Sequence, residues 1–250
     1  MSHEPRLIIF SGAGLDAASG IPTFRDSNGL WEGNDVMEVC TMSTFEQNYE
    51  KVHRFYNQMR TALANVEPNS AHKFIAEMQD EYGAARVVNF TANVSDLLER
   101  ANVQNVRHVH GILTEIITDY KGPDHETKTV GYTEYDFEQD RIDARTFQPN
   151  CKPNVVFFGE MAPMYAEMDY ILQGLRPQDT FVIVGSTLEV NPVHHYAWGK
   201  DCYSVIINPS YKEGSESPLD IAGMTVTSAL SLTAEDGFEC IRDLIKKRMG

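Results

Sequence analysis

The first residues that suggest chemistry are two glycines that follow an apolar run near the start of the chain. Leu7–Phe10 is predicted to be a buried strand and leads directly into Ser-Gly-Ala-Gly at residues 11–14. Glycines at a strand-to-helix turn let the backbone approach a pyrophosphate, and a helix N-terminus supplies N–H groups. The next glycine is Gly20, so the G-x-G-x-x-G fingerprint is not met, and a tight turn that needs only small residues remains an alternative. We expect the nearby Asp16 to point away from a pyrophosphate or to hydrogen-bond a ribose.

A histidine suited to acid–base chemistry lies in the segment His-Val-His-Gly at residues 108–111. Imidazole has an unperturbed pKa near neutrality, so a histidine can act as a general base at physiological pH. His110 follows a strand-like segment and precedes a glycine, which leaves room for the ring. In an extended segment His108 shares a face with His110, because side chains alternate. Spacing therefore does not separate the two, and a packed histidine remains an alternative for His110.

Short β-branched runs alternate with amphipathic helical patterns, which indicates an α/β fold. Apolar residues recur at steps of three and four from Phe45 to Leu63, which predicts one apolar helix face. Ser43 and Glu46 form a possible capping box before it. We therefore expect a Rossmann-like parallel sheet with helices on both faces. The predicted strands are Leu7–Phe10, Val87–Thr91, Val155–Phe158, Phe181–Val184 and Val205–Asn208, and two further helices have N-caps at Ser70 and at Thr233 with Asp236.

Two stretches interrupt this alternation and predict a small inserted domain. Residues 38–69 are helical without a strand, and residues 114–150 are polar with short alternating pieces. Nine acids and three bases between Glu115 and Asp143 exclude a central parallel strand there. We expect residues 1–37, 70–113 and 151–250 to form the Rossmann-like domain. Residues 38–69, as a helical insert, and 114–150, as a β-rich insert, are expected to form the small one.

Composition narrows the class of protein further. The 21 basic and 36 acidic residues give a formal net charge of −15, which argues against nucleic-acid binding and favours a neutral or basic partner. No apolar run of about 18 residues occurs, and the amino-terminal run is too short for a signal peptide. We expect a cytoplasmic monomer without membrane contact.

Neither disulfide nor metal chemistry is expected. His194 and His195 are adjacent, but no third ligand is spaced nearby. The cysteines lie far apart without a C-x-x-C pair, which is typical of free thiols in a reducing compartment. They are Cys40, Cys151, Cys202 and Cys240.

A series of short motifs runs nearly the length of the chain. They are Gly12-Ala13-Gly14, Ser19-Gly20-Ile21-Pro22-Thr23-Phe24-Arg25, Gly29-Leu30-Trp31, Pro68-Asn69-Ser70-Ala71-His72, Thr91-Ala92-Asn93-Val94, His108-Val109-His110-Gly111, Pro153-Asn154-Val155-Val156-Phe157-Phe158-Gly159-Glu160, Gly185-Ser186-Thr187-Leu188 and Ile207-Asn208. In order and spacing this series resembles the sirtuins, NAD-dependent protein lysine deacylases. The family fold, a large Rossmann-like domain with a small domain inserted, agrees with the two interruptions.

The resemblance implies NAD as cofactor and acylated lysine on a protein or peptide as substrate. It implies His110 as the catalytic base, with Asn93 at the nicotinamide ribose and His108 in a structural role. The implied cofactor-binding residues are Gly12, Ala13, Gly14, Phe24, Arg25, Asn93, Val94, Ser95, Gly185, Ser186 and Asn208. The acyl-lysine peptide would lie as an added strand between residues 158–160 and 188–190, and the implied substrate-binding residues are Phe158, Gly159, Glu160, Leu188, Val190 and Tyr56.

The reaction implied by the resemblance moves the acyl group from lysine to ADP-ribose. The acyl oxygen attacks the ribose carbon as nicotinamide leaves, and loop closure by Phe24 and Arg25 excludes water. His110 then activates a ribose hydroxyl, which attacks the acyl carbon. One water is consumed as the lysine leaves, and the products are nicotinamide, the free lysine and O-acyl-ADP-ribose.

Departures from the family pattern bear on the cofactor pocket and on zinc. Ala92 lacks an amide that would bond a ribose hydroxyl, and Ser95 replaces a carboxylate that reads the nicotinamide carboxamide. Losing one such bond costs about 1–3 kcal/mol. Where many members have four zinc-binding cysteines, this chain has only Cys151, so we predict a variant without the zinc cysteines and without a metal.

A third departure concerns the acyl group. Tyr56 matches a tyrosine of desuccinylating members, but Met59 stands where they have an arginine, and Arg60 lies a helical step of about 100° away. Without that guanidinium a bidentate grip on a carboxylate is lost, so we expect acetyl or other uncharged acyl groups. A core role for Tyr56 and Met59 remains an alternative.

Two other hypotheses remain open. The altered residues Ala92 and Ser95 motivate an NAD glycohydrolase or ADP-ribosyl transferase on the same fold. A non-enzymatic NAD- or peptide-binding module is the second, and the presence of Asn93 and His110 argues against it.

Overall fold

The computed structural model describes residues 4–22, 30–31, 34–122, 126–137, 150–211 and 226–250. In these residues the largest sheet has six parallel strands in the order β11-β10-β9-β1-β4-β5. The strands are β1 (Leu7–Ser11), β4 (Val87–Thr91), β5 (Arg107–His108), β9 (Thr180–Val184), β10 (Tyr203–Ile207) and β11 (Val226–Leu230). The order matches a doubly wound sheet, in which successive strands are added first on one side of β1 and then on the other.

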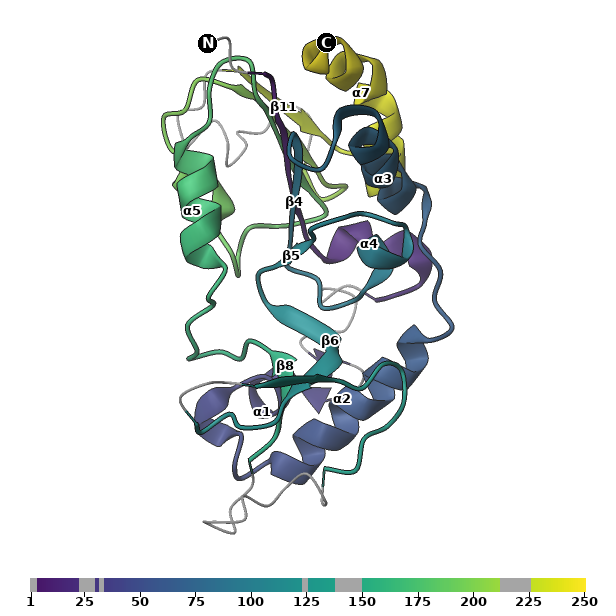
Figure 1. The fold of residues 1–250 in the computed structure, drawn as a ribbon, viewed down its shortest axis with the longest axis vertical. Helices are drawn as coiled ribbons and strands as arrows, with labels where there is room; N and C mark the ends of the chain where they lie inside the picture. The colour runs from purple at the N-terminus through teal and green to yellow at the C-terminus, as the bar shows by residue number, and fades with distance from the viewer. Residues whose placement is uncertain (1–3, 23–29, 32–33, 123–125, 138–149, 212–225) are drawn as a thin grey trace.

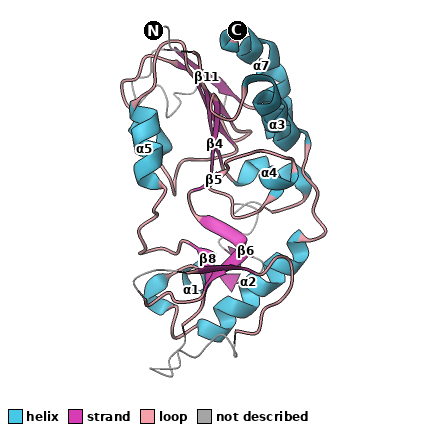
Figure 2. Cartoon of the chain, viewed as in Figure 1, coloured by secondary structure: helices cyan, strands magenta, loops and turns pink. Residues whose placement is uncertain are grey.

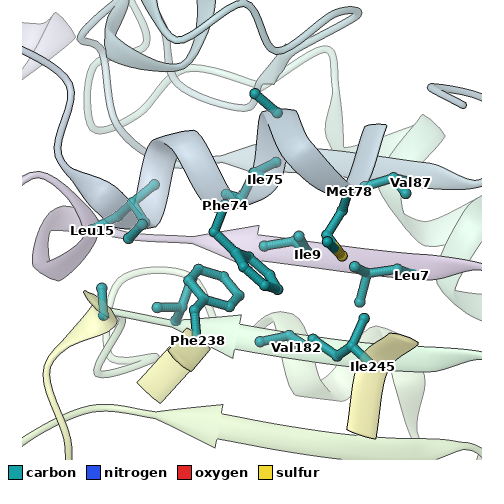
Figure 3. Packing of buried hydrophobic residues seen from close by; sticks show 14 of the residues in the cluster. Leu7, Ile9, Leu15, Phe74, Ile75, Met78, Val87, Val182, Phe238 and Ile245 are labelled. Carbon is teal, nitrogen blue, oxygen red and sulfur yellow. The ribbon is translucent and has the colours of Figure 1, made fainter. Parts of the chain in front are cut away.

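Both faces of this sheet are covered by helices, as the apolar strand runs predict. In β1, Leu7 and Ile9 face one core cluster and Ile8 and Phe10 face another, because strand side chains alternate. Helices α3 (Ser70–Tyr82) and α7 (Ala234–Met249) cover the first face, where their phenylalanine rings stack (Figure 3). Helix α5 (Tyr165–Gln173) lies on the side of the sheet opposite α3 and α7 (Figure 1). It contributes to the second cluster together with the short helix η4 (Val193–Ala197).

A second lobe contains an antiparallel sheet of three strands, β7-β6-β8, and lies below the large sheet in Figures 1 and 2. Its strands are β6 (Gly111–Ile117), β7 (Thr127–Thr129) and β8 (Lys152–Val155), and its helices are α1 (Val36–Val39) and α2 (Tyr49–Leu63). A third cluster, rich in aromatic rings, holds these elements together. Phe45 alone contacts four other rings in it.

Several short elements connect the two lobes or lie beside them. The glycine loop continues into two 3-10 turns, η1 (Ala13–Leu15) and η2 (Ala17–Ser19), and helix α4 (Leu97–Arg100) follows β4. A two-stranded piece pairs β2 (Leu30–Trp31) with β3 (Asn34–Asp35). None of the described helices combines the length and apolar character needed to cross a membrane.

The predicted α/β architecture is confirmed, but one strand was placed in the wrong sheet. The runs that begin near residues 7, 87, 181 and 205 are parallel strands of the large sheet. The predicted parallel strand Val155–Phe158 is wrong, because the strand there is Lys152–Val155 and it pairs antiparallel with β6. A short apolar run indicates that a strand is buried, but it does not indicate which strand it pairs with. β5 and β11 were not predicted.

The helix starts depend on which polar side chain reaches the free N–H groups. Thr233 caps α7 by accepting from the Asp236 N–H, as predicted. The capping box of Ser43 and Glu46 is wrong, because a 3-10 turn, η3 (Met42–Thr44), intervenes and α2 starts at Tyr49. Asn69, not Ser70, caps α3. Asn and Ser have similar capping preferences, so sequence alone does not choose between neighbours.

Candidate active site

Four neighbouring strands of the large sheet end beside one another and present the motif residues. β1, β4, β9 and β10 lead into Gly12, Asn93, Gly185 and Asn208 respectively, all at the carboxyl edge of the sheet. Chain order reverses between β1 and β9. In open α/β sheets, ligands bind at this reversal, outside the carboxyl ends of the strands.

The glycine loop is packed directly against the turn after β9. The Gly12 N–H donates to the Val184 carbonyl and the Gly14 N–H to the Gly185 carbonyl, both at 2.9 Å. A Cβ on Gly14 would lie 2.6 Å from the Gly185 Cα, and Gly185 itself has a φ of +65°. Both positions therefore need glycine for close backbone approach.

Asp16 points away from the outer side of this loop, as one of the two expectations had it. Its carboxyl group is buried and lies 3.0 Å from the His72 Nε2 and 2.6 Å from the Ser95 Oγ. The His72 Nδ1 accepts from the Asn69 N–H, so its Nε2 carries the proton that it donates to Asp16. The Ser95 hydroxyl is thus already used inside the protein.

Asn93 bridges the ends of β4 and β1. Its side-chain Nδ2 donates to the Gly12 carbonyl at 3.0 Å, and its backbone N–H donates to the Thr91 Oγ1 at 3.1 Å. The neighbouring Val94 packs against the core of the second lobe, and its carbonyl accepts from the Leu113 N–H. Asn93 therefore lies beside the glycine loop.

His110 lies between the last strand of one sheet and the first of the other. Its Nδ1 is 3.3 Å from the Ala92 carbonyl oxygen, and its Nε2 is 3.0 Å from the Tyr165 hydroxyl. Gly111 follows with a φ of +83°, and a Cβ there would lie 2.1 Å from the Asn154 carbonyl oxygen. Burial lowers the pKa of His110, so its ring is neutral at physiological pH and retains a lone pair.

His108 has different partners, although spacing alone places it on the same face. Its Nδ1 lies 3.0 Å from the Asn93 carbonyl oxygen and its Nε2 lies 2.7 Å from Glu99. Burial lowers the pKa of His108, but the hydrogen bond and charge of Glu99 outweigh it, so the pKa is raised overall. Both partners of His108 are acceptors, whereas the Tyr165 hydroxyl beside His110 can also donate.

Next to β9 and β10, two predicted cofactor residues contact each other. The Asn208 Nδ2 donates to the Ser186 carbonyl at 2.8 Å, and the Asn208 Oδ1 accepts from the Ser210 N–H. The Ser186 Oγ accepts from the Leu188 N–H. The predicted cofactor residues Phe24 and Arg25 lie outside the described residues.

The two predicted peptide-binding segments each leave one apolar side chain exposed. Phe158 is 42% exposed and Val190 is 63% exposed, whereas Leu188 is buried with a φ of +64°. The Phe158 N–H donates to the Cys40 carbonyl, and its carbonyl accepts from the Met42 N–H. Gly159 then turns the chain with a φ of +92°.

A buried lysine that sequence reasoning missed supports this segment. Lys152 forms an ion pair with Glu160 at 2.9 Å, and its ammonium lies 3.9 Å from the centre of the Phe157 ring. Glu160 also accepts from the Phe157 N–H at 2.7 Å, which closes the turn that exposes Phe158. Lys152 lies before the predicted strand Val155–Phe158, and nothing in the sequence signals its burial.

Tyr56 is fully buried in the second lobe. Its hydroxyl lies 3.1 Å from the Cys40 Sγ, and its ring stacks on Phe157. Burial raises the pKa of both groups, to about 11 for the Cys40 thiol. In the described part of the chain, no group of three or more His, Cys, Asp or Glu side chains could hold a metal ion.

Comparison with known proteins identifies the family. The model of the Sir2 family matches residues 12–192. An NAD-dependent protein deacylase of Helicobacter hepaticus is 41% identical over 203 residues, which cover 73% of this chain and 75% of that protein. One of Campylobacter jejuni is 40% identical over 214 residues, 84% of each. A solved Sir2 homologue in complex with NAD has a TM-score of 0.77 at 25% identity, over 99% of this chain and 92% of that one. The chain belongs to the Sir2 family.

We predict that Lys152→Met lowers the free energy of unfolding by about 3 kcal/mol, because it leaves the Glu160 carboxylate without its cation. Urea unfolding measures this. Lys51→Met is the matched control, since Lys51 pairs with Glu38 on the surface, where such pairs contribute about 1 kcal/mol or less. Equal effects of the two substitutions would contradict the role given to Lys152.

Proposed function

We propose that this chain removes acyl groups from lysine side chains of proteins, with NAD as the second substrate. The observation that carries the proposal is the neutral His110 imidazole beside Asn93 and the glycine loop, at the chain reversal of a doubly wound sheet. Its relatives in Helicobacter hepaticus and Campylobacter jejuni are NAD-dependent protein deacylases. This residue set supplies one base and no nucleophile of its own.

The residues at the sheet edge suit a dinucleotide. Glycine at positions 12 and 14 leaves only the Ala13 methyl group on the loop, and Asp16 is turned inward, so its carboxylate does not face a pyrophosphate there. We propose that Gly12, Ala13 and Gly14 contact the pyrophosphate, that Asn93, Val94 and Ser95 line the nicotinamide ribose, and that Gly185, Ser186 and Asn208 line the adenine ribose. Phe24 and Arg25 are proposed to contribute to cofactor binding. NAD supplies an electrophilic ribose carbon with nicotinamide as the leaving group.

In this proposal His110 takes a proton from a ribose hydroxyl at its Nε2, the nitrogen with the lone pair. The Ala92 carbonyl holds the proton on Nδ1 and so fixes which nitrogen is the base. The acyl-lysine peptide pairs by its backbone with residues 158–160 and 188–190. A net charge of −15 favours basic target segments.

NAD glycohydrolysis or ADP-ribosyl transfer is the second candidate, and a specific contact favours it. The Ser95 Oγ is bonded to Asp16, and Ala92 has no side-chain donor, so two positions that would read the cofactor supply fewer polar groups. In a pocket with fewer polar groups on the cofactor, the release of nicotinamide depends less strictly on a bound acyl-lysine.

The two candidates are separated by one assay with a base variant. With NAD and an acetyl-lysine peptide, we expect equal amounts of nicotinamide and deacetylated peptide, and little nicotinamide without peptide. His110→Ala is expected to lower deacetylation at least about 100-fold while leaving NAD affinity nearly unchanged. His195→Ala, at an exposed histidine, is the control. Peptide-independent release of nicotinamide would favour the second candidate.

The same assay has an expected pH dependence. Burial lowers the pKa of His110 below its ordinary value of 6.5, so the base stays neutral at pH 7. Activity should be lost only as pH falls through that lowered pKa, and the acid limb of kcat/KM should therefore lie below pH 6.5. A limb above pH 7 would contradict His110 as the base.

We propose that the acyl group is acetyl or another uncharged group. Met59 packs against the core of the second lobe, and the buried Arg60 donates to the Leu113 carbonyl and the Asn57 side chain. Met59 carries no charge, and the Arg60 guanidinium is fully buried in the second lobe, so neither residue presents an exposed cation to an acyl carboxylate. Tyr56 is fully buried in the core of the second lobe with its hydroxyl on Cys40, so it presents no exposed hydroxyl to an acyl carboxylate.

We therefore expect an acetyl-lysine peptide to be processed at least 10-fold more efficiently than the same peptide carrying succinyl-lysine. Both peptides have identical flanking residues, so the ratio of kcat/KM values reports the acyl group alone. Equal or better use of the succinyl peptide would contradict the assignment.

We also propose that the second lobe needs no zinc. Its aromatic core is continuous, and Cys151, the cysteine in the interval, is buried in it with its Sγ 2.9 Å from the Tyr49 hydroxyl. We expect less than about 0.1 equivalent of zinc in the purified protein and no change in melting temperature on adding a chelator. One tightly held equivalent per chain, with a chelator-dependent loss of stability, would contradict this.

The remaining proposals concern the location, the oligomeric state and the partners of the protein. We propose a cytoplasmic monomer that acts on proteins and binds neither nucleic acid nor membranes. The excess of acidic residues argues against a basic face that would bind the phosphate backbone of a nucleic acid.

A further inference from the structure

The nitrogen of His110 that would act as base contacts a residue outside the family motifs. The Tyr165 hydroxyl lies 3.0 Å from the His110 Nε2, and the two rings meet edge to face with centroids 6.2 Å apart. The other ring nitrogen, Nδ1, has only the longer contact of 3.3 Å with the Ala92 carbonyl. The shorter of the two contacts therefore involves the nitrogen that carries the chemistry.

The direction of this hydrogen bond follows from its partners. A carbonyl only accepts, so the Ala92 contact requires the proton on Nδ1, and the Nε2 of the neutral ring is then an acceptor. Burial raises the pKa of Tyr165, so its phenol remains protonated at neutral pH. The tyrosine is therefore the donor and the imidazole the acceptor.

Tyr165 is held in place by regular structure. It is the first residue of α5, which packs on the large sheet through Met168 and Leu172. Its backbone N–H donates to the Ala162 carbonyl, and its ring faces Tyr196 of η4 with centroids 6.4 Å apart. A donor on a packed helix orients its acceptor better than one on a free loop.

We propose that Tyr165 is a positioning residue for the base, whose hydroxyl orients the His110 ring and holds it in the neutral form with the proton on Nδ1. This inference rests on the proposed function of His110. A substrate hydroxyl would afterwards replace the phenol as the donor to the same lone pair. Tyr165 thereby extends the working range of the base toward lower pH.

The surroundings of His110 leave few other groups to produce this effect. Among the described residues, the titratable side chains that face the ring or its partner are Tyr165 from α5, Tyr196 behind it on η4, and His108 on the same segment. The His108 ring contacts Glu99 and Asn93 instead. No described carboxylate is hydrogen-bonded to the His110 ring.

The test needs no substrate. Protein labelled with ¹⁵N in its histidines is titrated by NMR as wild type and as Tyr165→Phe, and His110→Ala identifies the resonance. We expect the wild-type neutral ring to carry its proton on Nδ1. A donor to Nε2 favours the neutral form, so its removal should raise the titration midpoint of His110 by about 0.5 to 1 pH unit. Tyr170→Phe, on the exposed face of the same helix, should leave the midpoint unchanged.

The pH profile of catalysis tests the role of Tyr165 independently. Because kcat/KM reports the free enzyme, its acid limb should move to higher pH in Tyr165→Phe by the same amount, with up to about 10-fold loss below the limb. The alkaline plateau should change less than about 3-fold. A purely structural role would lower the plateau and leave the limb in place.

Two results would overturn the inference without touching the deacylase assignment. One is a wild-type neutral ring that carries its proton on Nε2, and the other is an unchanged or lower midpoint in Tyr165→Phe. Conversely, if His110→Ala retains wild-type deacylation, the proposed function fails while the NMR result still reports the Tyr165 contact.

Discussion

A buried carboxyl group, that of Asp16, ties together the segments on which the rest of the site depends. One oxygen contacts the His72 ring on α3 and the other the Ser95 hydroxyl after β4. Burying a carboxyl group without such partners costs free energy. The burial of Asp16 therefore requires α3 and the segment after β4 to lie next to the glycine loop. Because both oxygens face the interior, the outer side of the glycine loop keeps only backbone groups and small side chains. The requirement for an inward-facing acid is therefore also what makes the loop acceptable to an anionic ligand.

The two histidines of the motif illustrate how partners, and not spacing, set a chemical role. His108 and His110 are two residues apart, and their alternation along the chain gives both the same expected orientation. In the structure His108 contacts an acid and a carbonyl, which favour its charged form, whereas His110 contacts a carbonyl and a phenol, which leave it one lone pair. The strand ends at His108 and residues 109–110 form a turn, so the alternation expected of an extended segment does not hold for His110.

Much of the large sheet could be predicted because its strands are buried on both faces and read as continuous apolar runs. The four strands that carry motif residues were found in this way, and the motifs then fixed where the site had to be. What could not be predicted depends on contacts between distant segments. The pairing of β8 with β6 spans more than thirty residues, and β5 has only two residues and no pattern of its own. Lys152 and Tyr165 have no local signal, since their importance comes from Glu160 and His110 and not from their neighbours in sequence.

The position of His110 also explains why the second lobe matters for a site built on the first. The last strand of the large sheet on this side, β5, ends at His108, and β6 of the small sheet begins at Gly111 (Figure 1). The imidazole therefore lies on the short link between two sheets, and its own carbonyl accepts from the Val156 N–H, just after β8. The same stretch continues into the turn held by Lys152 and Glu160. Val156, which bonds to the His110 carbonyl, lies two residues before the exposed Phe158. The packing of the aromatic core beneath this segment therefore sets the positions of both His110 and Phe158.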